Sequence, residues 1–523
     1  MDRDLRSVQE VRELLAKAEA AMPALRELSQ KDVNKITEAM AQAGFQASER
    51  LAKMAVEETG FGKYEDKVIK NRFATRNLLQ YIAGLKTVGF IEEEPKNRVW
   101  KIAEPMGVVA AIIPSTNPTS TAMYKAIISL KARNAIVMSP HPAAVRCTLE
   151  AAGIMAAAAE RAGAPKGAIA CMSLPEMAGT QELMKHAITK VILATGGTGL
   201  VRAAYSAGKP AFGVGPGNVP AFIERTADVR KAVKDIVASK TFDYGTVCAS
   251  EQSLIADRPV KDEVVAELKR NNAYFCTTQE IAALEKVMIT PRGSINAAIV
   301  GQPAWRIAEM AGFQVAGETS MLVVPLDGVG KSYPLSMEKL SPVISFYEAD
   351  GWEDGCQRCI EIINFGGLGH TLCLHTRDEN VIREFALKKP VFRVLVNTGG
   401  THGAIGYTTG LEPALTLGCG TWGGSITADN VTPLHLINIK RLAYEINPLH
   451  PGEAPEEQPA KGKRWRYDEK YHYRPVAEKK PEPEVRADAP ATATPLPGAQ
   501  VQYGTSGITE EQIEAIIKEF TKK

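Results

Sequence analysis

The sequence predicts an α/β protein made of two doubly wound lobes, a small β element and a C-terminal tail. Two observations support this fold class. From residue 107 onward, short and almost wholly apolar runs alternate with helical stretches, and this is typical of strands buried on both faces of a parallel sheet. Near residue 448 the composition changes abruptly to Pro, Ala, Glu and Lys, with few side chains that a core could bury.

The first lobe is expected to cover residues 1–242. It opens with amphipathic helical patterns up to residue 82. The apolar runs that follow are interpreted as buried strands, at residues 107–114, 135–138, 168–173, 190–194 and 211–214. An alternating segment over residues 88–104 is interpreted as an exposed hairpin that contributes to oligomerisation.

The second lobe is expected over residues 243–425. Its buried strands are predicted near residues 253–256, 343–348, 369–375 and 391–397. Because doubly wound sheets bind ligands outside the carboxyl ends of their strands, two successive lobes imply a cleft at those ends. Residues 426–447 alternate apolar and polar side chains after the lobe has ended, as an edge strand that pairs with a partner subunit would.

The end of the chain divides into a tether and a short helix. Residues 448–506 are expected to form a disordered linker. Within residues 507–523, Thr509 and Gln512 form a capping box. The helix that they begin carries one apolar stripe, made of Ile513, Ile516, Ile517 and Phe520. Since a single short helix is marginal by itself, we expect the stripe to dock on a partner, and packing on the chain's own lobes is the alternative.

Charge and hydropathy exclude several classes of function. Lys and Arg number 62 against 60 for Asp and Glu, so no net field attracts nucleic acid or an anionic membrane. No apolar run approaches the ~18 residues of a membrane span, and a secretory pattern is lacking at the N-terminus. We therefore expect a cytoplasmic protein with neither nucleic-acid nor membrane partners.

Eight cysteines are spread along the chain, and in a reducing cytosol such residues are mostly buried small hydrophobes. Cys356 and Cys359 form a C-x-x-C pair. A second pair at zinc spacing is missing, and the surrounding segment has helical periodicity. Core packing is therefore favoured for this pair over a redox or metal role, and no metal site is expected.

Cys248 is the candidate nucleophile. It lies in TFDYGTVCASEQ (241–252), after a glycine-containing turn and before a predicted strand, at the junction of the two lobes. A thiolate at this place could attack an aldehyde carbonyl, and the resulting thiohemiacetal is a good hydride donor. A buried, inert cysteine is the alternative interpretation.

Asn117 is the candidate oxyanion donor. The predicted strand 107–114 runs into Ser115, Thr116 and Asn117, which places an amide at the carboxyl end of a central strand. With the backbone N–H of Cys248 it would form a two-donor hole, and losing one such donor costs on the order of 10²–10³ in rate. An asparagine that only caps the following helix is the competing interpretation.

Two glycine clusters suggest a nucleotide site. The segment ATGGTG (194–199) lies between a predicted strand and a helix, and FGVGPGN (212–218) lies between two strands. Residues 195–199 could present backbone N–H groups and a helix N-terminus to a phosphate. Neither cluster is the full dinucleotide fingerprint, and glycines used only for turn geometry explain them equally well.

The segments that carry chemistry are residues 104–142, 194–224, 242–252, 337–343, 367–371 and 415–425. Together they resemble the coenzyme-A-acylating branch of the aldehyde dehydrogenase superfamily, in particular the propionaldehyde and acetaldehyde dehydrogenases of bacterial microcompartments. The likeness covers roughly residues 5–445 in unbroken order. It implies an aldehyde dehydrogenase-like fold, in which the first lobe binds NAD and the second carries the nucleophilic cysteine.

The resemblance assigns roles to single residues. It makes Cys248 the nucleophile and Asn117 the oxyanion donor, and it places His370 near the reacting centre. Glu338 in MEKLSPV would hold the nicotinamide ribose. The expected cofactor-binding residues are Thr195, Gly196, Gly197, Ser115, Thr116, Ser139, Pro140, His141, Gly213, Val214, Gly215, Glu338 and Leu340.

One departure from the hydrolytic relatives concerns the acyl acceptor. Those enzymes carry a Glu-Leu-Gly-Gly segment whose Glu activates the deacylating water, whereas the matching residues 212–217 here lack a carboxylate. A thioester at Cys248 would then persist until coenzyme A attacks it. Residues 139–142 also lack the Lys of the hydrolytic members. In this respect they are similar to a surface that serves NAD and coenzyme A in turn.

The resemblance implies the NAD-dependent oxidation of a small aliphatic aldehyde, propanal first, to acyl-coenzyme A by a homodimer or homotetramer. It also implies that residues 508–523 are an encapsulation peptide that binds shell or core proteins inside a bacterial microcompartment. Two alternatives remain, a hydrolytic aldehyde dehydrogenase and a catalytically inactive assembly protein.

Overall fold

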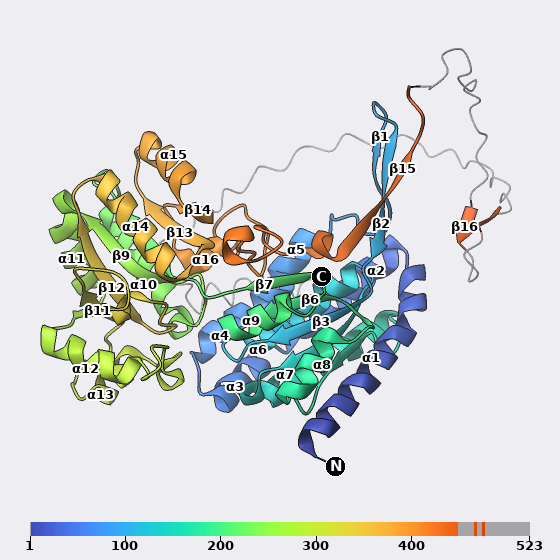
Figure 1. Ribbon diagram of the computed structural model, residues 1–523, viewed down its shortest axis with the longest axis horizontal. Coiled ribbons are helices and arrows are strands. Elements are labelled where there is room, and N and C mark those ends of the chain that lie inside the picture. The colour runs from blue at the N-terminus through green and yellow to red at the C-terminus, as the bar shows by residue number, and fades with distance from the viewer. Residues whose placement is uncertain (1, 448–464, 468–472, 476–523) are drawn as a thin grey trace, which may run out of the picture. The chain divides into compact units, whose positions relative to one another are not determined.

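The computed structural model of the chain describes residues 2–447, 465–467 and 473–475 (Figure 1). Contacts divide the chain into two compact units, and the larger one comprises the residues up to Glu94 together with Val99–Leu442. All the predicted site residues belong to this larger unit, and so do the two large sheets described below.

Five helices precede the first large sheet. They are α1 (Arg3–Glu27), α2 (Gln30–Gln46), α3 (Ser48–Thr59), α4 (Tyr64–Arg72) and α5 (Leu78–Ile82), with a π-helical turn between the last two. Capping residues determine where two of these helices begin or end. Ser29 and Asp32 form a capping box at the start of α2, and Gly60 ends α3 with a left-handed φ of 68°. The amphipathic helices predicted up to residue 82 are confirmed.

A five-stranded parallel sheet forms the first lobe, in the order β5-β4-β3-β6-β7. Its strands are β3 (Val108–Ile113), β4 (Ala135–Pro140), β5 (Ile169–Cys171), β6 (Thr189–Thr195) and β7 (Ala211–Val214). The helices between them are α6 (Pro118–Lys131), α7 (Val145–Ala162), α8 (Met177–Lys185) and α9 (Thr198–Tyr205). All five strands predicted for this lobe are confirmed, and every residue of β3 and β4 is buried, as continuous apolar runs require.

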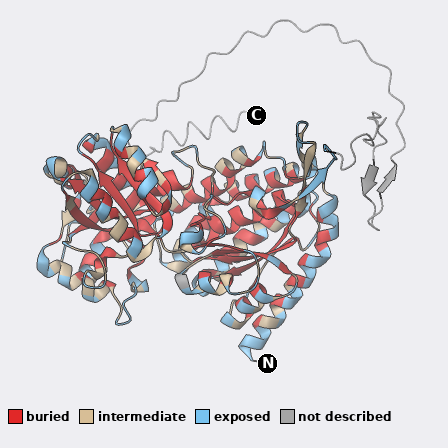
Figure 2. Ribbon diagram, turned by 45° about the horizontal axis from the view of Figure 1, so that its top comes forward, coloured by how far each residue is buried: buried red, intermediate tan, exposed pale blue. Residues whose placement is uncertain are grey.

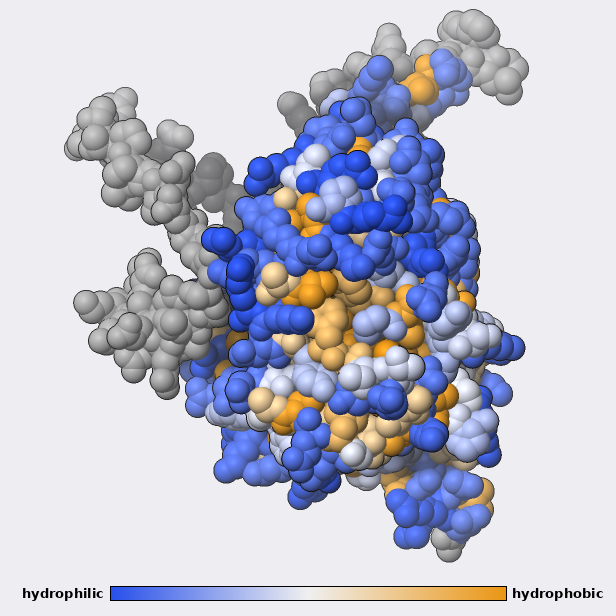
Figure 3. Space-filling view, turned by 90° about the vertical axis from the view of Figure 1, so that its left-hand side faces the viewer, coloured by the Kyte–Doolittle hydropathy of each residue, from blue (hydrophilic) through white to orange (hydrophobic). Residues whose placement is uncertain are grey.

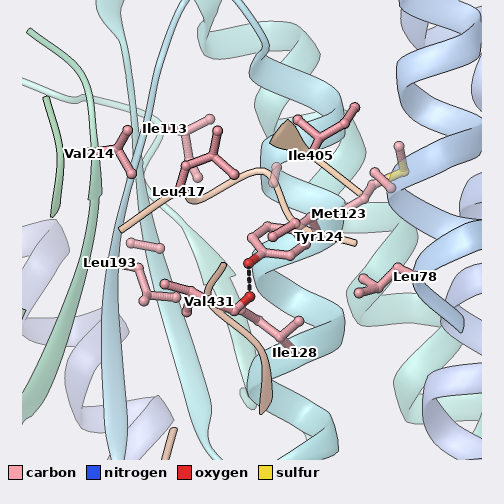
Figure 4. Packing of buried hydrophobic residues seen from close by; sticks show 14 of the residues in the cluster. Leu78, Ile113, Met123, Tyr124, Ile128, Leu193, Val214, Ile405, Leu417 and Val431 are labelled. Carbon is pink, nitrogen blue, oxygen red and sulfur yellow. Dashed lines mark hydrogen bonds between the residues drawn. The ribbon is translucent and has the colours of Figure 1, made fainter. Parts of the chain in front are cut away.

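The core of the first lobe is built around α6, whose residues are all buried. Tyr124 of this helix donates a hydrogen bond to the carbonyl of Val431, a residue that lies 307 positions further along the chain (Figure 4). Figure 2 shows that the buried residues gather on the strands and on the helix faces turned toward them. The segment after the second lobe therefore returns to complete the core of the first.

A seven-stranded parallel sheet forms the second lobe, in the order β10-β11-β12-β9-β8-β13-β14. Its strands are β8 (Val219–Ile223), β9 (Glu251–Asp257), β10 (Ala273–Phe275), β11 (Met321–Pro325), β12 (Val343–Ala349), β13 (Gly369–His375) and β14 (Val391–Val396). Its helices are α10 (Val229–Thr241), α11 (Lys261–Arg270), α12 (Thr278–Met288), α13 (Ala304–Met310), α14 (Trp352–Gly366), α15 (Glu379–Lys388) and α16 (Gly400–Ala404). The four strands predicted here are confirmed, and β10 and β11 are additional to them.

The second lobe begins earlier than the expected boundary between residues 242 and 243. The strand β8 precedes that boundary, yet it pairs with β9 and β13 of the second sheet. All five of its residues are buried. A strand buried on both faces needs a central place in a sheet, and β8 occupies that place in the second sheet. The chain therefore crosses between the lobes after β7, and Val219 starts the second lobe.

Cys356 and Cys359 are buried on α14, with exposed fractions of 6% and 0%. They belong to an apolar cluster with Phe222 and Phe385. The prediction that this C-x-x-C pair packs in the core is confirmed. Lys389 donates a hydrogen bond to the sulfur of Cys356.

A separate three-stranded sheet has the order β1-β2-β15, with β1 at Gly89–Glu94, β2 at Val99–Pro105 and β15 at Ile437–Ala443. The hairpin predicted over residues 88–104 and the strand predicted within 426–447 are thus confirmed as elements, and their role in oligomerisation stays a prediction. Inside the expected linker, β16 (Trp465–Tyr467) and β17 (Tyr473–Pro475) pair antiparallel. The helix predicted over 507–523 lies outside the described residues.

Figure 3 shows one face of the second lobe, and most side chains at the edge of this face are hydrophilic. In Figure 3 apolar side chains gather in the middle of this face, with hydrophilic ones around them. Among the described residues, no helix is long and apolar enough to cross a bilayer.

Candidate active site

The predicted cofactor-binding residues of the first lobe come together at one edge of its sheet. Residues 115–117 follow β3, 139–141 lie at the end of β4, 195–197 at the end of β6, and 213–215 at the end of β7. These strands are parallel neighbours, so all these segments lie at the carboxyl edge. The strand order reverses between β3 and β6, and such a reversal opens the crevice in which doubly wound sheets bind nucleotides.

The end of β6 has the features of a phosphate site. The hydroxyl of Thr195 is buried and has no hydrogen-bond partner within the protein. Gly197 is the N-cap residue of α9, and no side chain caps that helix. A Cβ added at Gly197 would meet only open space. A dinucleotide pyrophosphate fits here, because the first turn of α9 offers backbone N–H groups and the partial positive charge of a helix N-terminus.

The segment after β4 divides into a buried and an accessible part. The hydroxyl of Ser139 lies 2.8 Å from that of Thr180 and is buried, so it already has its partner. His141 is exposed, and its Nδ1 accepts a hydrogen bond from the backbone N–H of Ala143 at 3.1 Å. The expected role of residues 139–141 in binding the adenosine end thus stays a prediction, with His141 as the reachable side chain.

Cys248 lies in the loop between the 3-10 turn Phe242–Gly245 and β9. The described residues include all eight cysteines, and of these only Cys248 and Cys171 are half-buried while the others are buried. The structure thus shows a half-buried cysteine at position 248, and its role as the nucleophile stays a prediction. Enough protein surrounds the thiol, however, that burial raises its pKa to about 12, and the nearby carboxylate of Glu338 adds to this rise.

Gly217 is the point where the catalytic candidates meet. Its backbone N–H donates to the carboxylate of Glu338 at 2.8 Å. A Cβ added at this glycine would lie 2.2 Å from the carbonyl oxygen of Cys248 and 3.1 Å from two ring carbons of His370. The structure thus brings together three residues that the sequence assigned to one site, and only glycine fits between them.

Glu338 and Leu340 occupy the segment that approaches from the second lobe. Burial raises the pKa of Glu338 to about 7, although the N–H of Gly217 and the charge of Lys240 partly oppose this. Leu340 has a left-handed φ of 46°, and its carbonyl accepts a hydrogen bond from the N–H of Gly301 at 3.0 Å. The expected contacts of both residues with the cofactor stay predictions.

His370 is fully buried at the start of β13. Its Nδ1 lies 2.9 Å from the hydroxyl of Thr371, and its Nε2 has no partner within the protein. The two ring carbons nearest to Gly217 are those that flank Nε2, so the edge of the ring that carries this nitrogen faces Gly217. Burial, together with the charge of Arg393, lowers the pKa of His370 to about 3. The imidazole is therefore neutral at physiological pH.

Asn117 occupies the N-cap position of α6, yet its side chain makes no capping hydrogen bond. The interpretation that this asparagine only caps the helix is therefore wrong. Its Oδ1 accepts a hydrogen bond from the ammonium group of Lys70. Its Nδ2 lies 3.4 Å from the carbonyl oxygen of Thr246, two residues before Cys248. The amide thus lies beside the loop that carries the nucleophile, where an oxyanion donor is needed.

The sequence analysis missed a buried charged cluster next to this amide. Lys67 and Lys70 of α4 both donate to the Oδ2 atom of Asp243. The signal in the sequence is weak, because two lysines at positions i and i+3 of a short helix are typical of a solvated face. Within the described residues no group of three or more His, Cys, Asp or Glu side chains is placed to hold a metal ion.

Comparison with known proteins agrees with this geometry. A sequence model of the aldehyde dehydrogenase family matches residues 4–411. The bifunctional aldehyde-alcohol dehydrogenase AdhE of Escherichia coli K12 is 45% identical over 445 residues, which make up 84% of this chain and 50% of that protein. The chain thus spans about half the length of several curated relatives that it matches.

Two solved structures extend the comparison. An acetylating aldehyde dehydrogenase from Geobacillus thermoglucosidasius is 53% identical, with a TM-score of 0.84 that covers 86% of this chain and 99% of that one. A propionaldehyde dehydrogenase from the fucose utilisation bacterial microcompartment of Clostridium phytofermentans is 25% identical, with a TM-score of 0.77 that covers 83% and 97%. The chain therefore belongs to the aldehyde dehydrogenase family, in its acylating branch.

Proposed function

We propose that the chain oxidises a small aliphatic aldehyde with NAD and transfers the acyl group from Cys248 to coenzyme A. The observation that supports this most is the meeting of Cys248, His370 and Glu338 around Gly217, with the amide of Asn117 beside the same loop. A thiol, an amide donor and a carboxylate in one place are what thiohemiacetal chemistry needs.

The reaction begins when the thiolate of Cys248 attacks the aldehyde carbonyl. The developing oxyanion accepts hydrogen bonds from the amide of Asn117 and from the backbone N–H of Cys248. NAD, when bound, would supply the acceptor for the hydride of the thiohemiacetal carbon, and Cys248 would then hold the acyl group as a thioester. His370, neutral with a pKa near 3, offers its free Nε2 as a hydrogen-bonding group and not as a charge.

The proposal that coenzyme A is the acyl acceptor is supported by the surroundings of Gly213 on β7. A Cβ at Gly213 would lie 2.4 Å from the hydroxyl of Tyr205 and 2.8 Å from Val201. The place where hydrolytic relatives carry their water-activating Glu is thus packed by α9. Without that base the thioester resists water, and the thiol of coenzyme A, a better nucleophile, attacks it and releases the thiolate of Cys248.

For NAD, the free hydroxyl of Thr195 and the open N-terminus of α9 would hold the pyrophosphate. The carboxylate of Glu338 lies near the thiol, where the ribose next to the nicotinamide would have to lie. Thr195 ends β6, and Glu338 binds Gly217 after the neighbouring strand β7, which supports a dinucleotide that extends along this edge of the sheet.

Propanal is the aldehyde that we propose first, inside a bacterial microcompartment. The propionaldehyde dehydrogenase among the solved relatives comes from such a compartment. The tail of this chain carries the amphipathic pattern expected of an encapsulation peptide at residues 508–523, which lie outside the described residues. An acetylating relative at higher identity makes ethanal the competing substrate.

Initial rates of NADH formation test the proposal, measured with ethanal, propanal and butanal in the presence and absence of coenzyme A. Turnover should require coenzyme A, and propanal should give the highest kcat/KM. The Cys248→Ala variant should bind NAD as the wild type does and form no acyl-enzyme by mass spectrometry. Steady turnover without coenzyme A would show a hydrolytic enzyme instead, and activity retained by Cys248→Ala would remove Cys248 from the mechanism.

A further inference from the structure

A buried cluster of three charged side chains lies behind the proposed oxyanion site. Lys67 and Lys70 have side chains that are 4% exposed, and the side chain of Asp243 is fully buried. Both ammonium groups bind the same oxygen, Oδ2 of Asp243. A second carboxyl group lies beside them, because the half-buried Asp66 accepts a hydrogen bond from the backbone N–H of Asp243 at 2.7 Å. Charges are buried in this way only when a dense set of hydrogen bonds compensates for lost water.

The ammonium group of Lys70 also contacts two loops of the site. This group donates to Oδ1 of Asn117 and, at 3.1 Å, to the hydroxyl of Thr246. Asn117 follows β3 of the first lobe, and Thr246 precedes Cys248 by two residues. Lys67 instead donates to the backbone carbonyl of Thr116 at 3.0 Å and makes no hydrogen bond with the Asn117 side chain.

The chemistry of an amide makes the contact with Lys70 directional. An ammonium group can only donate, whereas the two ends of an asparagine amide are an acceptor oxygen and a donor nitrogen. Oδ1 of Asn117 must therefore face Lys70, and the NH₂ group must face away from it. There Nδ2 donates a hydrogen bond to the hydroxyl of Thr116 at 3.1 Å and has a longer contact of 3.4 Å with the carbonyl of Thr246.

We infer that Lys70 is a positioning residue, which fixes the amide of Asn117 with its NH₂ group toward the carbonyl bound at Cys248 and strengthens that group as a donor. The strengthening arises because a cation at the amide oxygen polarises the N–H bonds. The inference rests on the proposed function, in which Asn117 stabilises the oxyanion.

The rest of the cluster holds Lys70 in place. Asp243 has a left-handed φ of 49°, and its Oδ1 accepts a hydrogen bond from the N–H of Lys63 at 2.7 Å. A Cβ at Gly62 would lie 2.0 Å from the same Oδ1, so only glycine fits there. The hydroxyl of Thr246 donates to Oδ2 at 2.6 Å. Burial would raise the pKa of Asp243, but the two ammonium groups outweigh it and hold the pKa below its usual range.

A double-mutant cycle between Lys70 and Asn117 in the full-length enzyme tests the inference. Asn117→Ala should lower kcat/KM for the aldehyde by a factor on the order of 10²–10³. Lys70→Met should lower it by a factor on the order of 10–10², and the dissociation constant for NAD should stay within about twofold of the wild type. In the double variant the Lys70 substitution should add less than about a twofold loss, because its effect passes through the amide.

Lys67→Met is the matched control, since it removes an equal charge from Asp243 but leaves the contact between Lys70 and the Asn117 side chain. Its loss of kcat/KM should be at least about fivefold smaller than that of Lys70→Met. Lys70→Gln, a neutral donor, is the second variant for the cycle if Lys70→Met does not fold, and its loss should likewise vanish in the Asn117→Ala background.

The outcomes separate the inference from the proposed function. Losses that multiply in the double variant, or equal losses from Lys67→Met and Lys70→Met, overturn the positioning role of Lys70. If Asn117→Ala alone keeps wild-type kcat/KM, the oxyanion assignment fails and the inference fails with it. An intact acylation of Cys248 in that variant would still leave the proposed nucleophile standing.

Discussion

The thiol of Cys248 and the carboxyl group of Glu338 influence each other's protonation. Burial raises the pKa of Cys248 to about 12, and the charge of Glu338 contributes to this rise. Burial also raises the pKa of Glu338 to about 7. Only the thiolate reacts with electrophiles, so the apoenzyme should be slow to alkylate at neutral pH. Its alkylation rate should increase with pH up to at least 10 without a plateau.

The effect of the Glu338 charge on the pKa of Cys248 can be measured separately from the effect of burial, because Glu338 itself loses its charge at low pH. At pH 9 the carboxylate is ionised, and removing its charge in Glu338→Gln should favour the thiolate. The rate of iodoacetamide labelling at Cys248, measured by peptide mass spectrometry, should then increase by a factor on the order of 3. At pH 5.5 the wild-type carboxyl group is already neutral, so the two proteins should label at the same rate. A variant that labels more slowly at pH 9 would contradict the proximity of these two groups.

At the scale of elements, we propose that the packing of the helix α9 on the strand β7 affects which nucleophile attacks the thioester. The hydroxyl of Tyr205 on α9 donates to the carbonyl of Gly213 on β7 at 3.1 Å, and its ring fills the space beside this glycine. A carboxylate cannot enter this space while Tyr205 stays in place. This packing supports the proposal that the acyl acceptor is selected by the lack of space as well as by the missing Glu.

Opening this space should restore hydrolysis. Gly213→Glu alone should lower thermal stability, because its Cβ meets Tyr205 and Val201. Combined with Tyr205→Ala, the carboxylate has room to activate water. NADH formation without coenzyme A should then exceed that of the Tyr205→Ala control by at least about tenfold. Equal rates in the double variant and its control, with both folded, would show that the missing base does not explain the survival of the thioester.

On the scale of the whole molecule, we propose that catalysis and assembly use different parts of the chain. Every residue proposed for the site lies between positions 70 and 370, within the larger unit. The sheet β1-β2-β15 stands apart from both lobes' sheets, with β15 at its edge. An unpaired edge is a template for another strand, which supports the proposal that this sheet joins subunits.

This separation predicts the behaviour of a shortened chain. A protein ending at residue 447 should keep kcat and KM within about twofold of the full-length values, because it retains the site and the three-stranded sheet. It should fail to co-purify with microcompartment shells that retain the full-length protein. A folded short chain without activity would show that the tail takes part in catalysis. Co-purification at the full-length level would remove the encapsulation role from residues 508–523.

The sequence by itself determined the lobes and most of their strands. Continuous apolar runs such as those of β3 and β4 must be buried on both faces, and the middle of a parallel sheet provides this burial. The same reasoning placed Asn117 and residues 195–197 at strand ends, where parallel strands deliver them to one edge. Cys248 became the candidate nucleophile because its segment joins a glycine turn to a buried strand, and the structure confirms that this strand, β9, is buried.

Only the tertiary structure decided which distant residues share an environment. Lys70 and Asp243 lie 173 positions apart, and a charged helix face in a sequence looks the same whether water or a carboxylate covers it. The membership of β8 in the second sheet depends on pairing with β9 and β13, which no local pattern encodes. Periodicity reports how a residue sits in its own element, whereas pairing, burial of charge and the orientation of an amide arise from contacts between elements.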